Sequence, residues 1–266
     1  MQDDTERLAR LARAWSEAAA GYEDYFVPRF APWVELAVDM VTEHPVPEGP
    51  VLVPCCGTFP ELDLLAARLP GREIVGIDLS EGMVALARER TAAVPFADAV
   101  VGDAQTLDAR WSGRCAAVVS VFGLQQIPDP VAAVGSWVDA LRPGGRLSIV
   151  FWPDATESDG PFALIAALLR ERFPAREEDS AWEDDLAAAV TGRGATLERD
   201  ELPAFPMVHS SAAAYFDASA ASGPLRALAL SQDEDFMGDL RAEYLSRAPE
   251  GEWRHDPHAR LITARR

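Results

Sequence analysis

Two aspartates each follow a short apolar run in the first half of the chain. Asp78 follows Glu73–Ile77 and lies about 20 residues after Gly57, and a carboxylate at this place can accept hydrogen bonds from both hydroxyls of a ribose. Asp103 follows the apolar run Ala99–Val101. Each has a simpler explanation, because Asp78 could cap a helix and Asp103 could stabilise a turn. Which explanation holds depends on the elements that position the two carboxylates.

Short apolar runs alternate with amphipathic segments through the middle of the chain. Runs that are apolar throughout are typical of strands buried on both faces of a parallel sheet. Their alternation with helices predicts an α/β protein with a doubly wound sheet, in which ligands bind beyond the carboxyl ends of the strands. The expected strands are 51–53, 73–77, 99–101, 116–121 and 146–152, and the expected helices between them are 61–69, 81–92 and 129–141.

The pattern is looser on both sides of this region. An amphipathic helix is expected over 3–20, and Pro28 and Pro32 are expected to end the helical pattern before a second helix at 33–42. Beyond Trp152, two strands should pair as a C-terminal hairpin and complete seven strands. The run Glu177–Asp185 is acidic and is expected to be a solvated face or a mobile loop. The further expected elements are the helices 161–173, 211–221 and 233–247 and the strands 196–202 and 260–264.

Five motifs occur together in order along the chain. They are VLVPCCGTFPELDLLAARLPGREIVGIDLSEGMVALARER, VVGDAQTLD, AAVVSVFGLQQIPDP and LRPGGRLSIVFW, of which the first contains two. The sequence resembles the class I S-adenosylmethionine-dependent methyltransferases, most closely the ubiquinone and menaquinone C-methyltransferase branch. The resemblance implies a Rossmann-like, mostly parallel sheet in one domain, 1–266. Within it we expect an N-terminal helical lid at 1–46, a cofactor-binding core at 47–152, and substrate-side helices with the closing hairpin at 153–266.

The resemblance also implies a cofactor and the residues that hold it. The cofactor is S-adenosylmethionine, with S-adenosylhomocysteine as the product, and Asp103 takes the place of the family's acid that contacts the adenine amino group. Leu79 and Met83 would pack on the adenine ring, although ordinary core packing explains Met83 nearly as well. The implied cofactor-binding residues are Pro54, Cys55, Cys56, Gly57, Asp78, Leu79, Met83, Asp103, Ala104, Ser120 and Val121.

The glycine-rich loop departs from the family pattern, acid-x-Gly-x-Gly-x-Gly. The acid is replaced by Val53 and the outer glycines by Cys55 and Phe59, so only Gly57 is retained. Pro60 is expected to hold Phe59 in an extended conformation, with its ring turned into the core behind the loop. The sequence therefore predicts a rearranged loop that still binds the cofactor.

Nearby acids offer a replacement for the missing charge at Val53. Glu61 or Asp63 could supply it, but both are better explained as solvated residues in the first turn of a helix, where the dipole favours acids. We therefore expect both carboxylates to be exposed.

The substrate side carries polar residues but no evident general base. Tyr22, Tyr25, Gln125, Gln126 and His209 are the candidates for contact with an acceptor, and each has an alternative explanation as an ordinary packed or loop residue. His255 and His258 are expected at the surface. No catalytic residue is assigned.

Composition excludes several kinds of partner. The formal net charge of −19 disfavours nucleic acid and anionic membranes. Three cysteines, with no secretion signal ahead of them, predict a reduced, cytoplasmic protein, either a monomer or a homodimer. Cys55 and Cys56 are expected to be structural, and no cysteine or histidine spacing predicts a metal site.

Three functions fit these observations. The first is transfer of a methyl group from S-adenosylmethionine to a small-molecule acceptor in bacterial secondary or quinone-like metabolism, driven mainly by proximity and orientation. The altered glycine loop keeps two others open: a fold relative with a non-methylating activity such as cyclisation, and a non-enzymatic binding protein.

Overall fold

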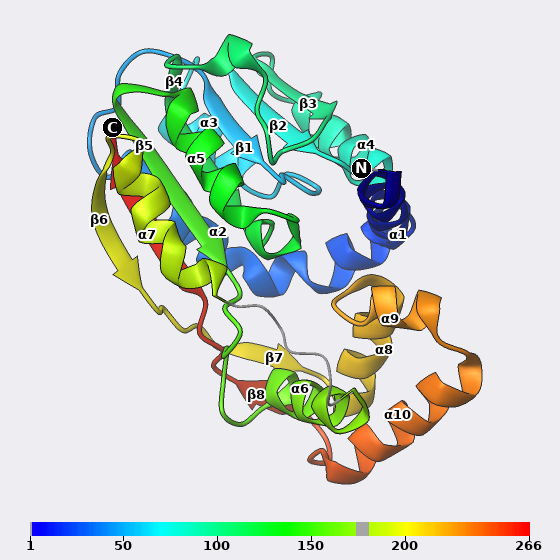
Figure 1. The fold of residues 1–266 in the computed structure, drawn as a ribbon. Helices are drawn as coiled ribbons and strands as arrows, with labels where there is room; N and C mark the ends of the chain where they lie inside the picture. The colour runs from blue at the N-terminus through cyan, green and yellow to red at the C-terminus, as the bar shows by residue number, and fades with distance from the viewer. Residues whose placement is uncertain (1, 174–180) are drawn as a thin grey trace. The chain divides into compact units, whose positions relative to one another are not determined.

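The computed structural model describes residues 2–173 and 181–266. The chain forms two compact units. The sheet unit comprises residues 31–153, 180–203 and 259–266, and the helical unit comprises residues 1–30, 154–179 and 204–258, in each case as far as these are described. The helical unit is therefore built from three separate segments of the sequence, two of which interrupt the sheet unit (Figure 1).

The sheet unit contains a seven-stranded sheet in the order β3-β2-β1-β4-β5-β9-β6 (Figure 1). The first five strands pair in parallel, while β9 pairs antiparallel with both β5 and β6. This confirms the predicted Rossmann-like sheet and the pairing of its two C-terminal strands. The strands are β1 Val51–Pro54, β2 Ile74–Asp78, β3 Ala97–Val101, β4 Cys115–Val121, β5 Leu141–Phe151, β6 Thr196–Glu201 and β9 Arg260–Arg265.

The order of the strands indicates at which edge of the sheet a ligand would bind; this edge is called the ligand edge. The connection from β1 runs to β2 and β3 on one side, and the chain then returns to β4 on the other side of β1. Such a reversal opens a crevice at the carboxyl ends of the strands that flank it. All seven residues of β4 are buried, and α5, at Pro130–Ala140, packs over this part of the sheet through Trp137 and Val138. The remaining helices of this unit are α2 Val27–Thr42, which begins in the helical unit, α3 Leu62–Arg68, α4 Glu81–Thr91, α7 Trp182–Gly192, and the 3-10 turns Ala109–Trp111 and Leu124–Gln126.

The two prolines near the N-terminus do not end the helical pattern, so that prediction is wrong. Helix α2 begins at Val27 and contains both. Pro28 lies in the first turn, where a backbone N–H has no helical partner, so its absence costs nothing. Pro32 removes one interior hydrogen bond, but Trp33, Val34 and Ala37 are almost fully buried, and their packing offsets that loss.

The acidic run is only partly within the described residues. Residues 177–180 lie outside them, whereas Glu183, Asp184 and Asp185 form the first turn of α7. Acids are favoured at a helix N-terminus by the helix dipole, so charge at this place starts a helix rather than a loop.

The helical unit has a small sheet of its own. Strand β7, at Met207–His209, pairs antiparallel with β8, at Trp253–His255.

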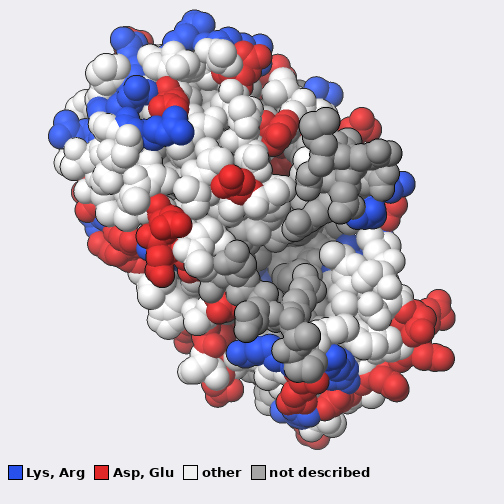
Figure 2. All heavy atoms as spheres, viewed as in Figure 1, with Lys and Arg blue, Asp and Glu red and all other residues white. Residues whose placement is uncertain are grey.

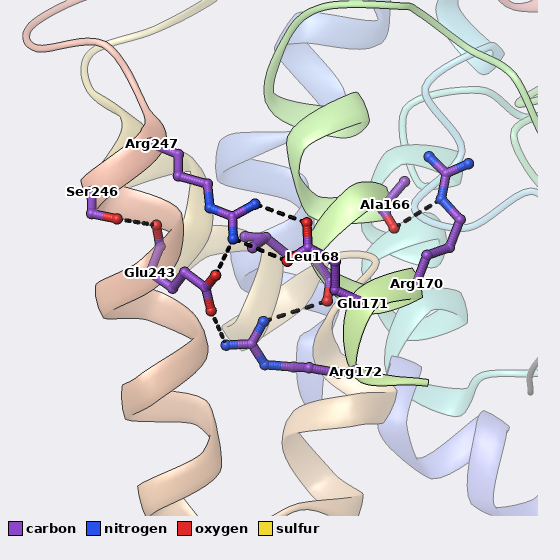
Figure 3. Close-up of polar contacts among 8 residues, drawn as sticks. All are labelled: Ala166, Leu168, Arg170, Glu171, Arg172, Glu243, Ser246 and Arg247. Carbon is purple, nitrogen blue, oxygen red and sulfur yellow. Dashed lines mark hydrogen bonds and ion pairs between the residues drawn. The ribbon is translucent and has the colours of Figure 1, made fainter. Parts of the chain in front are cut away.

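An ion-pair network joins helices α6, at Pro161–Arg172, and α10, at Glu234–Arg247. Arg172 and Arg247 share Glu243, and Arg247 also binds Glu171 through two bonds of 2.9 Å (Figure 3). The helices are α1 Gln2–Tyr25, α6 Pro161–Arg172, α8 Ala212–Ser222, α9 Arg226–Ser231 and α10 Glu234–Arg247.

Acidic and basic side chains are interspersed with neutral ones on the face drawn in Figure 2. No helix within residues 2–173 and 181–266 is long and apolar enough to cross a membrane.

Candidate functional site

Asp78, at the carboxyl end of β2, forms a hydrogen bond with the loop that follows β1. One carboxylate oxygen accepts a hydrogen bond of 2.8 Å from the backbone N–H of Gly57, and the other accepts one of 2.9 Å from Ser80. Burial raises the pKa of Asp78, and these amide hydrogen bonds oppose the rise. Ser80 itself caps α4 by accepting from Met83 at 3.1 Å. The helix cap is therefore Ser80, which leaves Asp78 at the crevice with lone pairs for a further donor.

The loop after β1 keeps the backbone conformation of a glycine-rich loop although two of its glycines are replaced. Cys55, Gly57 and Phe59 have φ of 56°, 52° and 68°. The expectation that Phe59 is extended is therefore wrong. A tight turn holds it, since its N–H donates to the Cys56 carbonyl at 2.7 Å. A left-handed conformation costs a non-glycine residue about 1–2 kcal/mol, which burial of a phenylalanine side chain, worth about 1.5–3 kcal/mol, can offset.

The Phe59 ring lies in the core behind the loop, as predicted. Phe59 is fully buried. A Cβ placed on Gly76 of β2 would stand 2.9 Å from the Phe59 ring and 2.7 Å from the Cys56 sulfur. Glycine at position 76 thus makes room for the two side chains, and the substitution of Phe59 does not fill the crevice.

Cys55 occupies the space beside Gly123, the residue after Phe122. A Cβ placed on Gly123 would stand 2.1 Å from the Cβ of Cys55, well inside contact distance. Burial, together with the charges of Asp78 and Asp103, holds the pKa of the Cys55 thiol well above its usual range, so the sulfur is a packed thiol rather than a nucleophile.

This contact predicts a compensating pair of substitutions. Gly123→Ala should lower the free energy of unfolding by about 1–2 kcal/mol, because the new methyl group overlaps Cys55. Adding Cys55→Gly should restore most of the loss, and chemical denaturation of the four proteins of this double-mutant cycle measures the coupling. Equal destabilisation with and without Cys55 would show that the two residues are not in contact.

The backbone of Gly57 is open to a ligand. No heavy atom of the described residues, apart from its chain neighbours, lies within 4 Å of where a Cβ on Gly57 would stand. An adenosyl group therefore fits the observed geometry: the backbone at Gly57 leaves it room, and Asp78, half-buried at the adjacent strand end, can accept from its ribose.

The other implied cofactor residues lie along the same edge with different exposures. Asp103 is exposed and accepts from the N–H of Gln105 at 2.8 Å, which is the turn contact expected of an aspartate there. Its contact with adenine stays a prediction. Met83 is 3% exposed, so it packs in the core. Leu79 is half-buried, Ala104, Val121 and Pro54 are buried, and the Ser120 hydroxyl donates to the Pro54 carbonyl at 2.9 Å.

Glu61 is not solvated, and that expectation is wrong. It is 2% exposed, and one carboxylate oxygen has no hydrogen-bond partner among the described residues. Burial raises the pKa of Glu61 to about 8, against a smaller lowering by its own backbone N–H and by Arg90. Asp63 is exposed, as expected. The helix dipole stabilises an acid in the first turn, but neighbouring apolar side chains determine whether water reaches it.

The raised pKa of Glu61 predicts how stability depends on pH. Between pH 4.5 and pH 8 the folded chain binds the Glu61 proton more tightly than the unfolded chain, so this residue's contribution falls as pH rises through that window. Glu61→Gln should remove this dependence, so that between pH 4.5 and pH 8 the parent loses about 4 kcal/mol of stability that the variant keeps. Thermal melts across this range, with Asp63→Asn as the exposed control, measure the effect. A parallel pH dependence in parent and variant would contradict it.

Aromatic rings follow β4 and β5 at the same edge of the sheet. Phe122 and Trp152 stack with ring centroids 4.2 Å apart and planes 7° apart, and Trp33 meets both edge-on at 5.7 and 5.2 Å. The Gln125 amide nitrogen donates to the Phe122 carbonyl at 2.7 Å, while its buried oxygen has no partner among the described residues. Gln126 is exposed.

Comparison with known proteins shows which kind of domain this chain carries. Residues 52–149 match the family model described as a methyltransferase domain. This match and the relatives below support a class I S-adenosylmethionine-dependent methyltransferase domain. The chain is 30% identical over 178 residues to trans-aconitate 2-methyltransferase of Acidovorax ebreus and 33% identical over 144 residues to demethylmenaquinone methyltransferase of Thermus thermophilus. These alignments cover 66% and 53% of this chain, and 61% and 62% of the relatives.

The fold of the chain also matches that of a solved structure. Geranyl diphosphate C-methyltransferase from Streptomyces coelicolor superposes with a TM-score of 0.52 at 13% identity, over 89% of this chain and 77% of that chain. At 13% sequence identity, this similarity shows only that the two proteins share a fold. The chain spans about three fifths of the length of the curated relatives named above.

In the helical unit, two of the predicted substrate residues are in contact. The hydroxyl of Tyr25 lies 2.9 Å from Nδ1 of His209, whereas Tyr22 packs among Trp15 and Phe26. His255 is 6% exposed and lies 3.0 Å from His209, so its expected surface position is wrong. His258 is exposed, as expected.

Sequence reasoning missed His255 because its neighbours are polar. The segment Glu252–Pro257 reads as a loop, yet Trp253–His255 pairs with β7 and turns His255 inward. Glu157 was missed for the same reason: it comes from a segment rich in polar residues, but its carboxylate is 5% exposed.

Proposed function

We propose that this protein transfers a methyl group from S-adenosylmethionine to a small-molecule acceptor. The observation that carries the proposal is the contact between the Asp78 carboxylate and the Gly57 N–H at the reversal of strand order. It holds an acid and an open loop backbone beside each other at the place where α/β proteins bind nucleosides. The named relatives support transfer rather than cyclisation or non-enzymatic binding.

Each residue at this edge would have a limited task. Asp78 would accept hydrogen bonds from the ribose hydroxyls, and the carbonyl and N–H groups after β1 would lie against the amino-acid end. Asp103 and Leu79 would bound the adenine. The bound cofactor supplies a methyl group that is already activated on a sulfonium. The chain's contribution is then to exclude water and to orient the acceptor in line with that methyl group.

The aromatic rings after β4 and β5 favour a planar, uncharged acceptor. Trp152 is half-buried and stacks on the buried Phe122 ring, with the buried Trp33 edge-on to both, and the buried amide oxygen of Gln125 lacks a partner among the described residues. None of these four side chains carries a positive charge to bind a tricarboxylate. We therefore favour an aromatic or quinone-like acceptor over a trans-aconitate-like one.

A labelled methyl group tests both parts of this proposal. Incubating the protein with S-adenosylmethionine labelled in the methyl carbon, and with simple quinols, phenols or trans-aconitate, should label the aromatic compounds. Trp152→Ala should lower that labelling at least about tenfold, since the stacked pair is lost. Label found only in trans-aconitate would contradict the acceptor class, and label found in none would contradict the transferase.

Cytoplasmic location, a monomer or homodimer and a role in secondary metabolism stay proposals. They rest on the acidic composition and the cysteine count.

A further inference from the structure

A chain of hydrogen-bonding groups runs through the helical unit from Glu157 to Tyr25. The Glu157 carboxylate lies 2.6 Å from Nδ1 of His255, and Nε2 of His255 lies 3.0 Å from Nε2 of His209. Nδ1 of His209 lies 2.9 Å from the hydroxyl of Tyr25. The four residues come from four segments that are far apart in the sequence, so their alignment is a product of the fold.

The donors and acceptors of this chain have one consistent direction. A carboxylate accepts only, so Nδ1 of His255 donates to Glu157. Nε2 of neutral His255 is then an acceptor, which requires Nε2 of His209 to donate. Nδ1 of neutral His209 is in turn an acceptor, so the Tyr25 hydroxyl donates to it. Burial, with the nearby His255 and Arg29, lowers the pKa of His209 to about 3 and keeps its ring neutral.

Burial differs between the two ends of the chain. The side chains of Glu157 and His255 are 5% and 2% exposed, and His209 is fully buried. Glu157 is held in place because its other oxygen accepts from the N–H groups of Phe162 and Ala163 at the start of α6. Tyr25 is only half-buried. The phenol end is therefore the more exposed end of the chain.

A positive charge lies over the phenol. The guanidinium carbon of Arg29 is 3.8 Å from the centre of the Tyr25 ring, and its Nε donates to the Val208 carbonyl at 3.0 Å. Burial raises the pKa of Tyr25 and Arg29 lowers it, so the phenol is neutral at rest while negative charge on its oxygen is stabilised. Further titratable groups near the chain include Tyr215, whose ring is 4.7 Å from His209, and Tyr244, which interacts with Tyr25 and Glu157.

We propose that Tyr25 takes the proton of a weakly acidic hydroxyl group on a small ligand of the helical unit, such as a phenol or quinol, and passes its own proton along His209 to His255. The proposal goes beyond the proposed function, because it assigns a ligand site to the helical unit itself.

The proton and electron movements balance. The ligand's hydroxyl proton moves to the oxygen of Tyr25 as the Tyr25 proton moves to Nδ1 of His209, and the Nε2 proton of His209 moves to Nε2 of His255. His255 becomes an imidazolium paired with the Glu157 carboxylate. The ligand oxygen keeps the electron pair of its O–H bond and becomes a phenolate. Return of the proton to water through Tyr25 resets the chain.

The direction of the hydrogen bonds is tested first, by nitrogen-15 NMR of the histidine rings in the full chain. The proposal expects a proton on Nε2 of His209 and on Nδ1 of His255. Variants in which each of the four histidines is replaced by glutamine assign the resonances. A proton on Nδ1 of His209 in the resting protein would overturn the proposal, because the ring could not accept from Tyr25.

Proton uptake is tested with a nitrophenol, whose phenolate absorbs visible light. In the presence and absence of S-adenosylhomocysteine, the parent protein should bind the nitrophenol and lower its apparent pKa by about one unit or more. Tyr25→Phe and Glu157→Gln should abolish the shift, and Tyr22→Phe, which removes a phenol hydroxyl one turn earlier in α1, should keep it. A purely structural network would leave the probe's pKa unmoved.

The outcomes distinguish this inference from the proposed function. A nitrophenol that does not bind, or that binds without a shift, overturns the proton transfer to Tyr25. Retention of the shift in Tyr25→Phe overturns it as well. Calorimetric titration with S-adenosylmethionine is independent of the probe, so loss of cofactor binding alone would contradict the proposed function and leave the probe result to decide the relay.

Discussion

Replacing Asp78 with alanine should weaken the binding of S-adenosylmethionine by about 2 kcal/mol or more, which is roughly 30-fold in the dissociation constant. Two charge-assisted hydrogen bonds to the ribose would be lost, and so would the bonds that Asp78 accepts from Gly57 and Ser80. The protein should still fold, since β1 and β2 remain paired through four residues each. Titration calorimetry measures the affinity.

Asp98 provides the matched control. It is an exposed aspartate on the adjacent strand β3, and its carboxylate accepts from the N–H of Ala99. Asp98→Ala should leave cofactor affinity within experimental error of the parent. Asp78→Asn separates charge from shape, because the amide fills the same volume and donates where a carboxylate accepts. An unchanged affinity in Asp78→Ala would sink the assignment of the ribose contact.

Replacing Phe59 with glycine should lower the free energy of unfolding by about 3 kcal/mol and should not tighten cofactor binding. The ring is fully buried against Gly76, so its removal leaves a cavity. Glycine adopts the left-handed conformation at φ 68° without strain, which regains about 1 kcal/mol of stability. The net loss is therefore at the lower end of the range for removing a buried phenylalanine ring.

Two measurements decide the role of Phe59. Chemical denaturation should rank the parent above Phe59→Leu, which fills part of the cavity, and Phe59→Leu above Phe59→Gly. Calorimetry should find equal or weaker cofactor binding in both variants. Much tighter binding in Phe59→Gly would mean that the ring obstructs the crevice, and it would favour a non-enzymatic protein over a methyltransferase.

The sheet could be predicted from the sequence because buried strands and their crossover helices have strong patterns. Runs such as Ala116–Val121 are apolar except for Ser120, which is typical of a strand covered on both faces, and the structure buries all of β4. The strands of the helical unit could not be predicted in this way. Met207–His209 and Trp253–His255 have three residues each, too few to display a period, and they depend on each other for pairing.

Local rules failed where tertiary packing outweighed them. Pro32 was expected to end a helix, but burial of Trp33 and its neighbours retains it inside α2. Pro60 was expected to keep Phe59 extended, but the turn after Cys56 and the burial of the ring impose a positive φ. In each case a preference of a few kcal/mol at most competes with side-chain burial of similar size.

The candidate site divides in the same way. Asp78 could be found because its distance from Gly57 along the chain follows from the size of one strand–helix unit. The burial of Glu61 and the alignment of His209 with His255 could not be found, since both depend on which side chains the fold places around them. A charged or polar residue is expected to contact solvent, and only the packing of the fold shows that Glu61, His209 and His255 are buried instead.

The crevice beside Asp78 is expected to bind an adenosyl cofactor for methyl transfer. Titration of the purified protein with S-adenosylmethionine and S-adenosylhomocysteine in a calorimeter measures this binding. We expect one site per chain for each compound, with competition between the two and loss of affinity in Asp78→Ala. Absence of binding at saturating concentrations of both compounds, in a protein that is folded by circular dichroism, would contradict it.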